Sequence, residues 1–377
     1  MKHNWEYKPF KQLANILYGC PFESDYFNSE SKGMPLIRIR DVKPGFTSTF
    51  FDGDYSDEYI IKKGEYLIGM DGEFNIAPWK SENALLNQRV CRVKSSNEEI
   101  LSTDFIFYFL GQELKRIEEK TPFVTVKHLS AKVLNSISTP VPHKKIQEQI
   151  VAELDKINEV MEDCRELLRN LDALAQSLFN ETFSSIEETV PLSFYVKALV
   201  GGKSLASKEV SPNKVLKSGA VTYDYFDKNS TKYLPVDYIP DSEHSVSTGD
   251  LIISRMNTAE LVGACAYVFD VDDNVYLPDR LWRIEYKSNA NPIYLWKSLI
   301  SESAKWQIRS KASGTSGSMK NISKPLLLSI NINKVPISIQ QQFAERIEAI
   351  EAEKKHVEAT IAELQTLLAS RMDYWFN

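Results

Sequence analysis

The chain has 377 residues and a formal net charge of −6, with 43% hydrophobic and 25% charged residues. This balance is typical of folded proteins and excludes a disordered or low-complexity chain, and the length predicts two domains. No uncharged run approaches the ~18–20 residues that a membrane span needs. Residues 1–10 carry charges without an apolar stretch, so we expect neither membrane association nor a signal peptide.

The cysteines and histidines give no sign of a metal site. The four cysteines form no C-x-x-C pair, and the five histidines show no H-E-x-x-H spacing. This argues against a zinc site or a disulfide framework and indicates a reducing, cytoplasmic location. We therefore expect no metal in this chain and no residues arranged for catalysis.

Two short motifs resemble pieces of enzymes but lack the rest of their sites. Gly201–Ser204 is similar to the end of a phosphate loop, yet Lys197 stands where that motif requires glycine. Asn291–Tyr294 is one residue from the N-P-P-Y motif of amino-methyltransferases, but no glycine-rich cofactor loop accompanies it. We interpret the second motif as a turn that opens a helix.

The acidic charge is concentrated in two short segments. Residues 141–186 have a net charge of −4 and residues 336–377 of −3, whereas residues 1–140 have −1 and residues 187–335 have +2. The two large segments are thus close to neutral, and a DNA-binding face remains possible in them.

Both acidic segments carry a heptad pattern. Apolar residues recur at alternating spacings of four and three from residue 150, and the same ladder returns 193 residues later from residue 343. A pattern sustained over about four heptads predicts a coiled coil, although one such helix alone could also pack on a globular core. We expect the two helices to pair through Ile150, Leu154, Ile157, Met161, Leu168, Leu171, Phe343, Ile347, Ile350, Val357, Ile361 and Leu364.

The globular segments before these helices also repeat. The offset between matched segments grows from 179 to 193 residues, as expected if loops lengthened in one copy of a duplication. The matched segments are Pro35–Arg38 with Lys214–Lys217, Gly64–Ile68 with Gly249–Ile253, Asn87–Val93 with Pro278–Ile284, Lys127 with Lys320, and Pro142–Gln149 with Pro336–Gln342.

The predicted fold class is α+β, used twice. Short strands are expected at Pro35–Val42, Glu65–Gly69, Val90–Val93, Gly219–Tyr225 and Leu251–Ser254, and helices at Asp104–Glu119 and Ile293–Arg309. We place globular domains at residues 1–143 and 183–336, and long helices at residues 144–182 and 337–377.

Side chains suited to nucleic acid occur at matching places in both copies. Arginine can bond guanine, asparagine can bond adenine, and small residues let backbone amides reach phosphates. For each residue alone, a surface charge or cap is the more frequent interpretation, and Arg89 and Arg280 could instead be ion-pair partners within the fold. The candidates are Arg38, Arg40, Lys43, Asn75, Lys80, Arg89, Arg92, Lys127, Lys203, Lys217, Arg255, Asn257, Arg280, Thr315, Ser316 and Lys320.

This arrangement resembles the specificity subunit of a Type I restriction-modification system. The likeness covers nearly the whole chain, and each half ends at a proline–glutamine helix start. The first start keeps the double proline typical of the family at Pro140 and Pro142, whereas the second has only Pro336. The motifs that carry the likeness are Gly64–Asn75, Leu85–Val90, Gly249–Thr258, Leu277–Leu281 and Gly314–Lys320.

The resemblance implies how such a chain would work. Two target-recognition domains would each read one half of a split double-stranded DNA sequence, and an antiparallel coiled coil would separate them. The subunit would be non-catalytic and would dock two methyltransferase subunits and, through them, up to two restriction-translocation subunits. S-adenosylmethionine, ATP and magnesium would belong to those partners, with no cofactor in this chain.

Three alternatives stay open at this point. A recognition subunit that serves a fused methyltransferase-nuclease of Type II kind is the nearest. A coiled-coil scaffold without DNA specificity would explain the helices but not the repeated cations. An enzyme with Asn291–Tyr294 as a methyltransferase remnant would lack the rest of its site.

Overall fold

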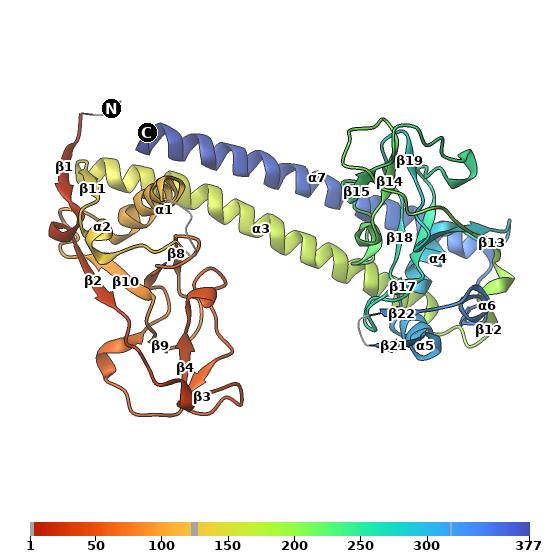
Figure 1. The fold of residues 1–377 in the computed structure, drawn as a ribbon, viewed down its shortest axis with the longest axis horizontal. Helices are drawn as coiled ribbons and strands as arrows, with labels where there is room; N and C mark the ends of the chain where they lie inside the picture. Colours follow the sequence, from red (N-terminus) through yellow and green to blue (C-terminus); the bar gives the residue numbers. More distant parts are fainter. Residues whose placement is uncertain (1–3, 122–126, 317–318) are drawn as a thin grey trace. The chain divides into compact units, whose positions relative to one another are not determined.

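The structure is a computed structural model that describes residues 4–121, 127–316 and 319–377. The chain forms two compact units (Figure 1). Unit 1 comprises Met1–Arg165 and Ala359–Asn377, and unit 2 comprises Glu166–Glu358. Each unit therefore contains a globular part together with one end of each of two long helices.

Unit 1 is built on a four-stranded antiparallel sheet. Its helix α1 (Thr103–Lys120) begins at Ser102, whose hydroxyl accepts a hydrogen bond from the Phe105 amide, and packs its apolar face on the sheet with α2 (Ala131–Asn135) nearby. The sheet order is β2 (Ala14–Tyr18), β10 (Val90–Ser95), β7 (Tyr66–Gly69) and β8 (Asn75–Pro78). A second sheet has the order β3 (Phe27–Asn28), β5 (Phe50–Phe51), β4 (Met34–Ile37), β9 (Ala84–Leu86) and β6 (Ile60–Ile61), and β1 (Glu6–Pro9) pairs with β11 (Ser138–Val141).

Unit 2 repeats this plan with one more small sheet. Its four-stranded sheet has the order β13 (Val196–Gly201), β20 (Leu281–Tyr286), β16 (Leu251–Ser254) and β18 (Cys265–Tyr267). The smaller sheets are β15 (Thr231–Tyr233), β14 (Lys214–Leu216) and β19 (Val275–Tyr276); β17 (Met256–Asn257), β22 (Met319–Asn321) and β21 (Ser313–Ser316); and β12 (Thr189–Pro191) with β23 (Asn331–Asn333). The short helices are α4 (Pro292–Leu299), α5 (Glu302–Lys311) and α6 (Lys324–Leu328).

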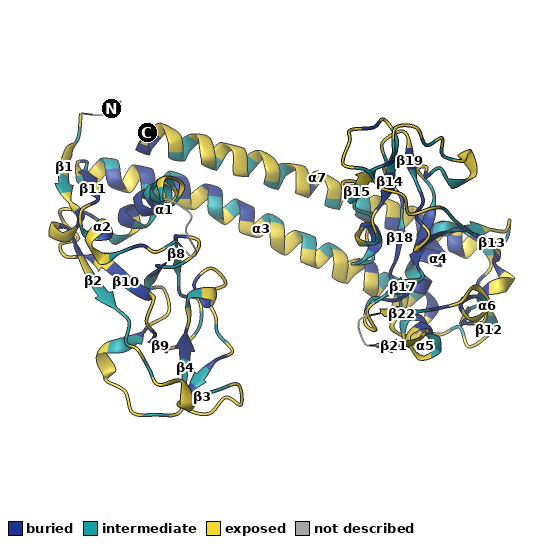
Figure 2. Ribbon diagram, in the orientation of Figure 1, coloured by how far each residue is buried: buried dark blue, intermediate teal, exposed yellow. Residues whose placement is uncertain are grey.

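The long helices are α3 (Lys144–Phe183) and α7 (Ile337–Phe376). Buried and exposed residues alternate along both (Figure 2), and every position of the heptad ladder is buried or half-buried. In unit 1 the start of α3 packs against the end of α7, with Ile150 and Leu154 in the same core as Trp375 and Phe376. In unit 2 the end of α3 meets the start of α7, where Ala175 shares a core with Phe343 and Ile347. The helices therefore run antiparallel, and the predicted fold class is confirmed.

Strand register confirms the duplication residue by residue. In unit 1 Cys91 of β10 pairs with Ile68 of β7, and in unit 2 Trp282 of β20 pairs with Ile253 of β16. These pairs are related by the offsets of 191 and 185 residues that the sequence predicts. The parallel pairs Leu36 with Leu85 and Val215 with Tyr276 agree in the same way with offsets of 179 and 191. The two copies therefore share one backbone plan.

One repeated glutamine explains the helix starts. Gln147 is fully buried; its side-chain amide donates to the Ile100 and Pro142 carbonyls and accepts from the Ser102 amide, at 2.8 Å each. Gln340 is also fully buried and makes the same set of bonds. It donates to the Asn289 and Val335 carbonyls and accepts from the Asn291 amide. Each glutamine thus ties the start of a long helix to the first turn of α1 or α4.

Three local predictions were wrong. Gly219–Tyr225 is not a strand: Ser218–Val221 form a short 3-10 helix that buries Ala220 and Val221, and Asp224 adopts a left-handed φ of 64° that ends the turn. The strand at Pro35–Val42 stops at Ile37, because Asp41 accepts a hydrogen bond from the Arg38 amide and opens another 3-10 turn. The helix at Ile293–Arg309 is broken into α4 and α5, where Ser301 caps the second helix.

Candidate nucleic-acid interface

In unit 1, backbone hydrogen bonds bring three distant segments together at the end of β7. The Met70 amide donates to the Arg89 carbonyl at 2.9 Å, and the Leu129 amide donates to the Met70 carbonyl at 2.7 Å. The Gly72 amide donates to the Lys127 carbonyl at 2.9 Å. Two predicted DNA-binding residues, Arg89 and Lys127, therefore lie beside the turn that follows β7.

In unit 2, three distant segments come together in the same way at the end of β16. The Arg255 amide donates to the Arg280 carbonyl at 3.1 Å, and the Ile322 amide donates to the Arg255 carbonyl at 3.0 Å. Asn257 of β17 pairs with Lys320 of β22. Four predicted DNA-binding residues from three segments, namely Arg255, Asn257, Arg280 and Lys320, are thus gathered on one small region.

The cations gathered in unit 1 are largely neutralised by carboxylates. Asp71 lies 3.0 Å from the Arg89 guanidinium and also contacts the Nδ1 atom of His128. Lys127 lies 3.8 Å from the Glu118 carboxylate and donates to the Glu118 backbone carbonyl at 2.6 Å, at the C-terminal turn of α1. Arg89 is 55% exposed and can still reach a ligand, whereas Lys127 is only 19% exposed and fixes its own loop to α1.

The cations of unit 2 are not neutralised in this way. Arg280 is exposed, and among the described residues no carboxylate lies within ion-pair distance of it. Arg255 lies over the Trp282 ring at 5.6 Å, and its Nε atom is buried with no hydrogen-bond partner in the described structure. Lys320 donates to the Gly314 carbonyl at 2.9 Å, and Asn257 accepts from the Thr258 amide.

The 3-10 turns after β4 and β14 hold a second group of predicted cations. Arg38 and Lys217 occupy the same position, directly before each turn, and both side chains are exposed. Arg40 donates to the Thr49 hydroxyl at 3.1 Å, and Lys43 pairs with Glu73. Two further predicted residues, Lys80 and Lys203, are exposed, and the side-chain amide of Asn75 donates to the Glu73 carbonyl.

Arg92 takes part in an ion pair of the sheet. It lies 3.0 Å from Glu65 and is 20% exposed, and its contact with DNA stays a prediction. Its counterpart Arg283 lies 3.9 Å from Asp250, so the same ion pair supports both sheets. The side chains of Thr315 and Ser316 lie outside the described structure, and their roles stay predictions.

The phosphate-loop-like motif contains a glycine that allows two backbones to pack closely. A Cβ atom on Gly202 would lie 1.9 Å from the Leu277 carbonyl oxygen, and one on Gly19, its counterpart in unit 1, would lie 2.0 Å from the Asn87 carbonyl oxygen. Glycine is required at both places because two backbones touch there. Asn291, from the other enzyme-like motif, caps α4 by accepting from the Ile293 amide at 2.9 Å, as expected for a helix start.

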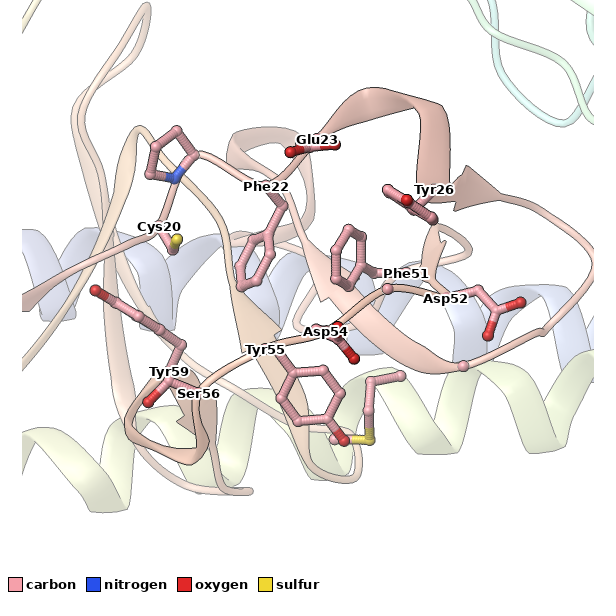
Figure 3. Close-up of a pocket in the computed structure, with 14 residues that line it drawn as sticks. Cys20, Phe22, Glu23, Tyr26, Phe51, Asp52, Asp54, Tyr55, Ser56 and Tyr59 are labelled. Atoms are coloured by element: carbon pink, nitrogen blue, oxygen red, sulfur yellow. The ribbon is translucent and has the colours of Figure 1, made fainter.

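Unit 1 also contains an aromatic pocket of about 1030 Å³ (Figure 3). Phe22 and Phe51 face each other there, with ring centroids 4.8 Å apart, and Tyr26, Tyr55 and Tyr59 complete the lining. The charged lining residues are Glu23, Asp52 and Asp54, which would repel phosphate. This pocket is therefore a poor candidate for a DNA contact.

Two of the four cysteines, Cys91 and Cys265, are buried. Burial raises the pKa of the Cys91 thiol to about 12 and raises that of Cys265 well above its ordinary value, so both thiols stay protonated. Across the residues that the structure describes, no three His, Cys, Asp or Glu side chains come together as a metal site. The same residues include no helix that is apolar and long enough to cross a bilayer.

Comparison with known proteins identifies the family to which this repeated fold belongs. Residues 2–167 and residues 202–366 match the Type I restriction modification DNA specificity domain. The chain belongs to this family. It carries the domain twice, and the resemblance inferred from the sequence is confirmed.

Individual relatives agree with the family assignment. The specificity subunit of the Type I restriction enzyme EcoBI from Escherichia coli is 40% identical over 154 residues, which are 41% of this chain and 32% of that relative. The match thus spans about a third of the EcoBI subunit. The MjaVIII specificity subunit of Methanocaldococcus jannaschii is 22% identical over 365 residues, covering 89% of this chain and 84% of that protein.

Two solved structures share the whole fold. The S subunit of a Type I restriction-modification system from M. genitalium has a TM-score of 0.59 at 15% identity, with 98% of this chain and 96% of that chain covered. A chain from a structure that addresses complex assembly and conformational transition of the type I R-M system has a TM-score of 0.56 at 16% identity, covering 99% and 97%. At these identities the likeness concerns the fold.

The long helices expose acidic side chains, with two exceptions. Glu153 and Glu351 are half-buried. Both are instead directed to partners: Glu153 accepts from Arg371 and from the Trp375 indole, and Glu351 pairs with Lys297 and Lys354. The exposed acids of these helices include Glu148, Glu159, Glu162, Asp163, Glu166, Glu345, Glu348, Glu353 and Glu358.

Sequence reasoning missed Asp71 and His128 as members of the candidate interface. Asp71 stands in the turn after β7, and the isolated bridge between Asp71 and His128 joins residues 57 positions apart. The repeat of the two globular segments points to this region, because residue 71 lies between the matched segments that contain Gly64 and Arg89. In the sequence alone Asp71 is an ordinary turn residue, and only the folded structure places its carboxylate beside Arg89.

Proposed function

We propose that this chain is the DNA-specificity subunit of a Type I restriction-modification complex, in which each unit reads one half of a split double-stranded target. The observation that carries the proposal is the repeated gathering of cations at the ends of β7 and β16 in a chain of this family. Arginine and asparagine side chains held at a loop cluster can reach base edges, and lysines beside them can neutralise phosphates.

The chain itself would perform no chemistry. Methyl transfer, translocation and cleavage would belong to two methyltransferase subunits and up to two restriction-translocation subunits. Those partners would also hold S-adenosylmethionine, ATP and magnesium, with no cofactor bound to this chain, and the assembled complex would act in the cytoplasm. The EcoBI and MjaVIII relatives are named as specificity subunits, and one structural neighbour comes from a study of complex assembly, which supports this division of labour.

The direct test is to map methylation. The chain, co-expressed with a Type I methyltransferase subunit that it activates, should direct methylation to one split sequence in a host genome. Replacing residues 187–335 with the corresponding unit of another family member should change one half of that sequence and leave the other half intact. A change in both halves, or methylation without sequence preference, would contradict separate reading by the two units.

The exposed acids of α3 are proposed as part of the methyltransferase contact. Carboxylates at Glu159, Glu162 and Glu166 lie on the exposed side of the helix, away from the apolar ladder. Reversal of all three to lysine should reduce co-purification of the methyltransferase, because like charges would then meet across the contact. Reversal of Asp25, Glu30 and Asp57, which are exposed acids on loops of unit 1, supplies the matched control. Equal recovery of the complex with both triple variants would assign the helix acids to solvation alone.

A further inference from the structure

Two aromatic side chains are exposed at the same place in the two copies of the fold. Phe46 of unit 1 is 61% exposed and Tyr225 of unit 2 is 56% exposed. They are 179 residues apart, the offset that also relates Leu36 of β4 to Val215 of the corresponding strand β14. A large aromatic ring left in water in both copies of a duplicated fold indicates a shared contact, because a single exposed apolar residue needs no explanation but a repeated one does.

Both rings follow a turn that directs them away from the core. A short 3-10 helix, Ile39–Asp41 or Ser218–Val221, leads to a residue with positive φ, which is 78° at Gly45 and 64° at Asp224. The Gly45 amide donates to the Asp41 carbonyl at 3.0 Å, and the Asp224 amide donates to the Val221 carbonyl at 3.1 Å. These bonds close the turns, so the next residue leaves toward solvent.

The turn of unit 2 is held firmly although its positive-φ residue is aspartate and not glycine. A left-handed backbone at aspartate is uncommon and needs support from its surroundings. Asp224 has such support, since its carboxylate accepts from the Cys265 amide at 3.2 Å and pairs with Lys305, and its carbonyl accepts from the Trp296 indole at 3.1 Å. The position of Tyr225 is therefore built into the fold.

The turn that leads to each ring also carries lysine. In unit 1, the Lys80 amide donates to the Gly45 carbonyl at 3.1 Å, and its side chain packs so close to Gly45 that a Cβ atom there would lie 2.7 Å from the Lys80 Cγ atom. Lys43 precedes Phe46 by three residues in the same turn. In unit 2, Lys217 opens the turn, and Tyr223, which is 71% exposed, stacks on Tyr225 at 6.2 Å with an interplanar angle of 18°.

We propose that Phe46 and Tyr225 enter a groove of the DNA and pack against bases of the half-site that each unit reads, while the adjacent cations hold the phosphates. The inference rests on the proposed function and adds two residues to it. In a duplex, an aromatic ring can contact a thymine methyl group in the major groove or wedge between two base pairs. Either contact gives the exposed ring an apolar partner, while lysines of the same turns can reach the phosphates.

The variants are chosen to separate the ring from the fold. Phe46→Ala and Tyr225→Ala remove the rings, and Tyr225→Phe keeps the ring but removes the hydroxyl. Matched controls are Tyr55→Ala in unit 1 and Tyr286→Ala in unit 2, each 40% exposed and outside the proposed contact. All are made in the full chain, and each is assembled with the methyltransferase before measurement.

The readout combines affinity with a fluorescent base. Once the methylated sequence is mapped, 2-aminopurine replaces in turn each adenine of both half-sites, on either strand, except the target adenines, whose own extrusion would dominate the signal. We expect the unaltered complex to change the fluorescence at one position or step in each half. Phe46→Ala should abolish that change in one half only and Tyr225→Ala in the other, each with a loss of affinity of about ten-fold. Tyr225→Phe and both controls should behave like the unaltered chain.

Other outcomes would overturn the inference in distinguishable ways. If the unaltered complex shows no preference for any sequence, the proposed function itself fails. If that complex is specific but Phe46→Ala and Tyr225→Ala bind and methylate as the controls do, only the role of the rings fails. If the two variants lose the methyltransferase on purification while the controls retain it, the rings contact the protein partner instead of DNA.

Discussion

Units 1 and 2 share a backbone but differ in the charge that surrounds the same strand end. After β7, residues 70–74 form a short turn in which Asp71 neutralises Arg89. After β16, residues 255–264 form a longer segment, and strand register places Met256 where unit 1 has Asp71. The counterpart of Arg89, Arg280, is exposed and without a carboxylate in the described structure. Duplication has thus kept the hydrogen-bonded frame while the surface chemistry diverged.

This difference separates residues that hold the fold from residues that can read a ligand. The frame is the part that repeats: the buried glutamines, the paired Arg92–Glu65 and Arg283–Asp250, and the two close-approach glycines. The part that differs lies in the turns at one end of the sheets, where side chains can change without breaking a backbone bond. Experiments that treat the two classes separately should therefore give different results.

The largest effect is expected at the buried glutamines. Gln147→Leu and Gln340→Leu should each lower the free energy of unfolding by about 2–4 kcal/mol, because each leaves backbone groups buried without a partner. The two losses should be similar, since the bonds are the same in both units. Chemical denaturation of the full chain measures this, with the exposed Gln149→Leu and Gln342→Leu as controls. A loss of stability at only one of the two glutamines would show that the hydrogen-bonded frames of the two units are not equivalent.

The next effect is expected at the close-approach glycines. Gly19→Ala and Gly202→Ala should each cost about 1–3 kcal/mol, because the new methyl group meets a backbone carbonyl that cannot move aside alone. Gly111 provides the contrast, since it lies within α1 and a Cβ atom there meets only the Ile76 side chain at 3.9 Å. Gly111→Ala should raise stability by up to about 1 kcal/mol through helix propensity. Thermal unfolding of the three variants tests both the expected losses of stability and the expected gain at Gly111. A Gly202→Ala variant as stable as the unaltered chain would contradict the packing explanation.

A reciprocal exchange tests the charge difference itself. Asp71→Asn should free Arg89 for phosphate, while Met256→Asp should give Arg280 a partner. On a duplex without the target sequence, the first variant should steepen the dependence of log K on log salt by about 0.9, and the second should flatten it by a similar amount. Affinity near 100 mM salt should move about three- to ten-fold, in opposite directions, in a titration from 50 to 200 mM. Identical slopes for both variants and the unaltered chain would show that neither arginine faces DNA.

Much of this organisation could be predicted from the sequence, because it depends on periodicity and repetition. The heptad ladder specifies which side chains of α3 and α7 are buried, and the stepwise offsets specify which residues of the two copies correspond. These signals survive divergence because they belong to many residues at once. The family resemblance rests on the same motifs, and residues 2–167 and 202–366 bear it out.

What could not be predicted depends on contacts between distant segments. The strand expected at Gly219–Tyr225 has the right alternation, but the buried contacts of Ala220 and Val221 and the support around Asp224 favour a 3-10 turn. Glu153 has the spacing of an outer-face acid, yet Arg371 lies within reach on the neighbouring helix. Asp71 shows its relation to Arg89 only once β7 and β10 pair. In each case the partner is far away in sequence.

The smallest expected effect concerns the two polar positions of the heptad ladder, one in each unit. Arg371 pairs with Glu153 in unit 1, where both side chains are about 30% exposed. Lys354 lies 2.7 Å from Asp172 in unit 2, where Asp172 is 66% exposed. Because solvent screens an exposed pair more strongly, Glu153→Gln should cost about 0.5–1 kcal/mol and Asp172→Asn less than that.

The contribution of the Glu153–Arg371 pair to stability should also depend on pH. Hydrogen bonds from Arg371 hold the pKa of Glu153 below its ordinary value of 4.5. A carboxyl with a lowered pKa stabilises the fold fully above its ordinary pKa, and that contribution is lost as the pH falls through the lowered value. The difference in unfolding free energy between the unaltered chain and Glu153→Gln should therefore be largest near pH 7 and shrink below pH 4. Glu148→Gln, an exposed change on the same helix, should show a small difference at every pH in urea denaturation. If the Glu153→Gln difference stayed constant from pH 7 to pH 3, the pair would contribute through packing of the side chains and not through charge.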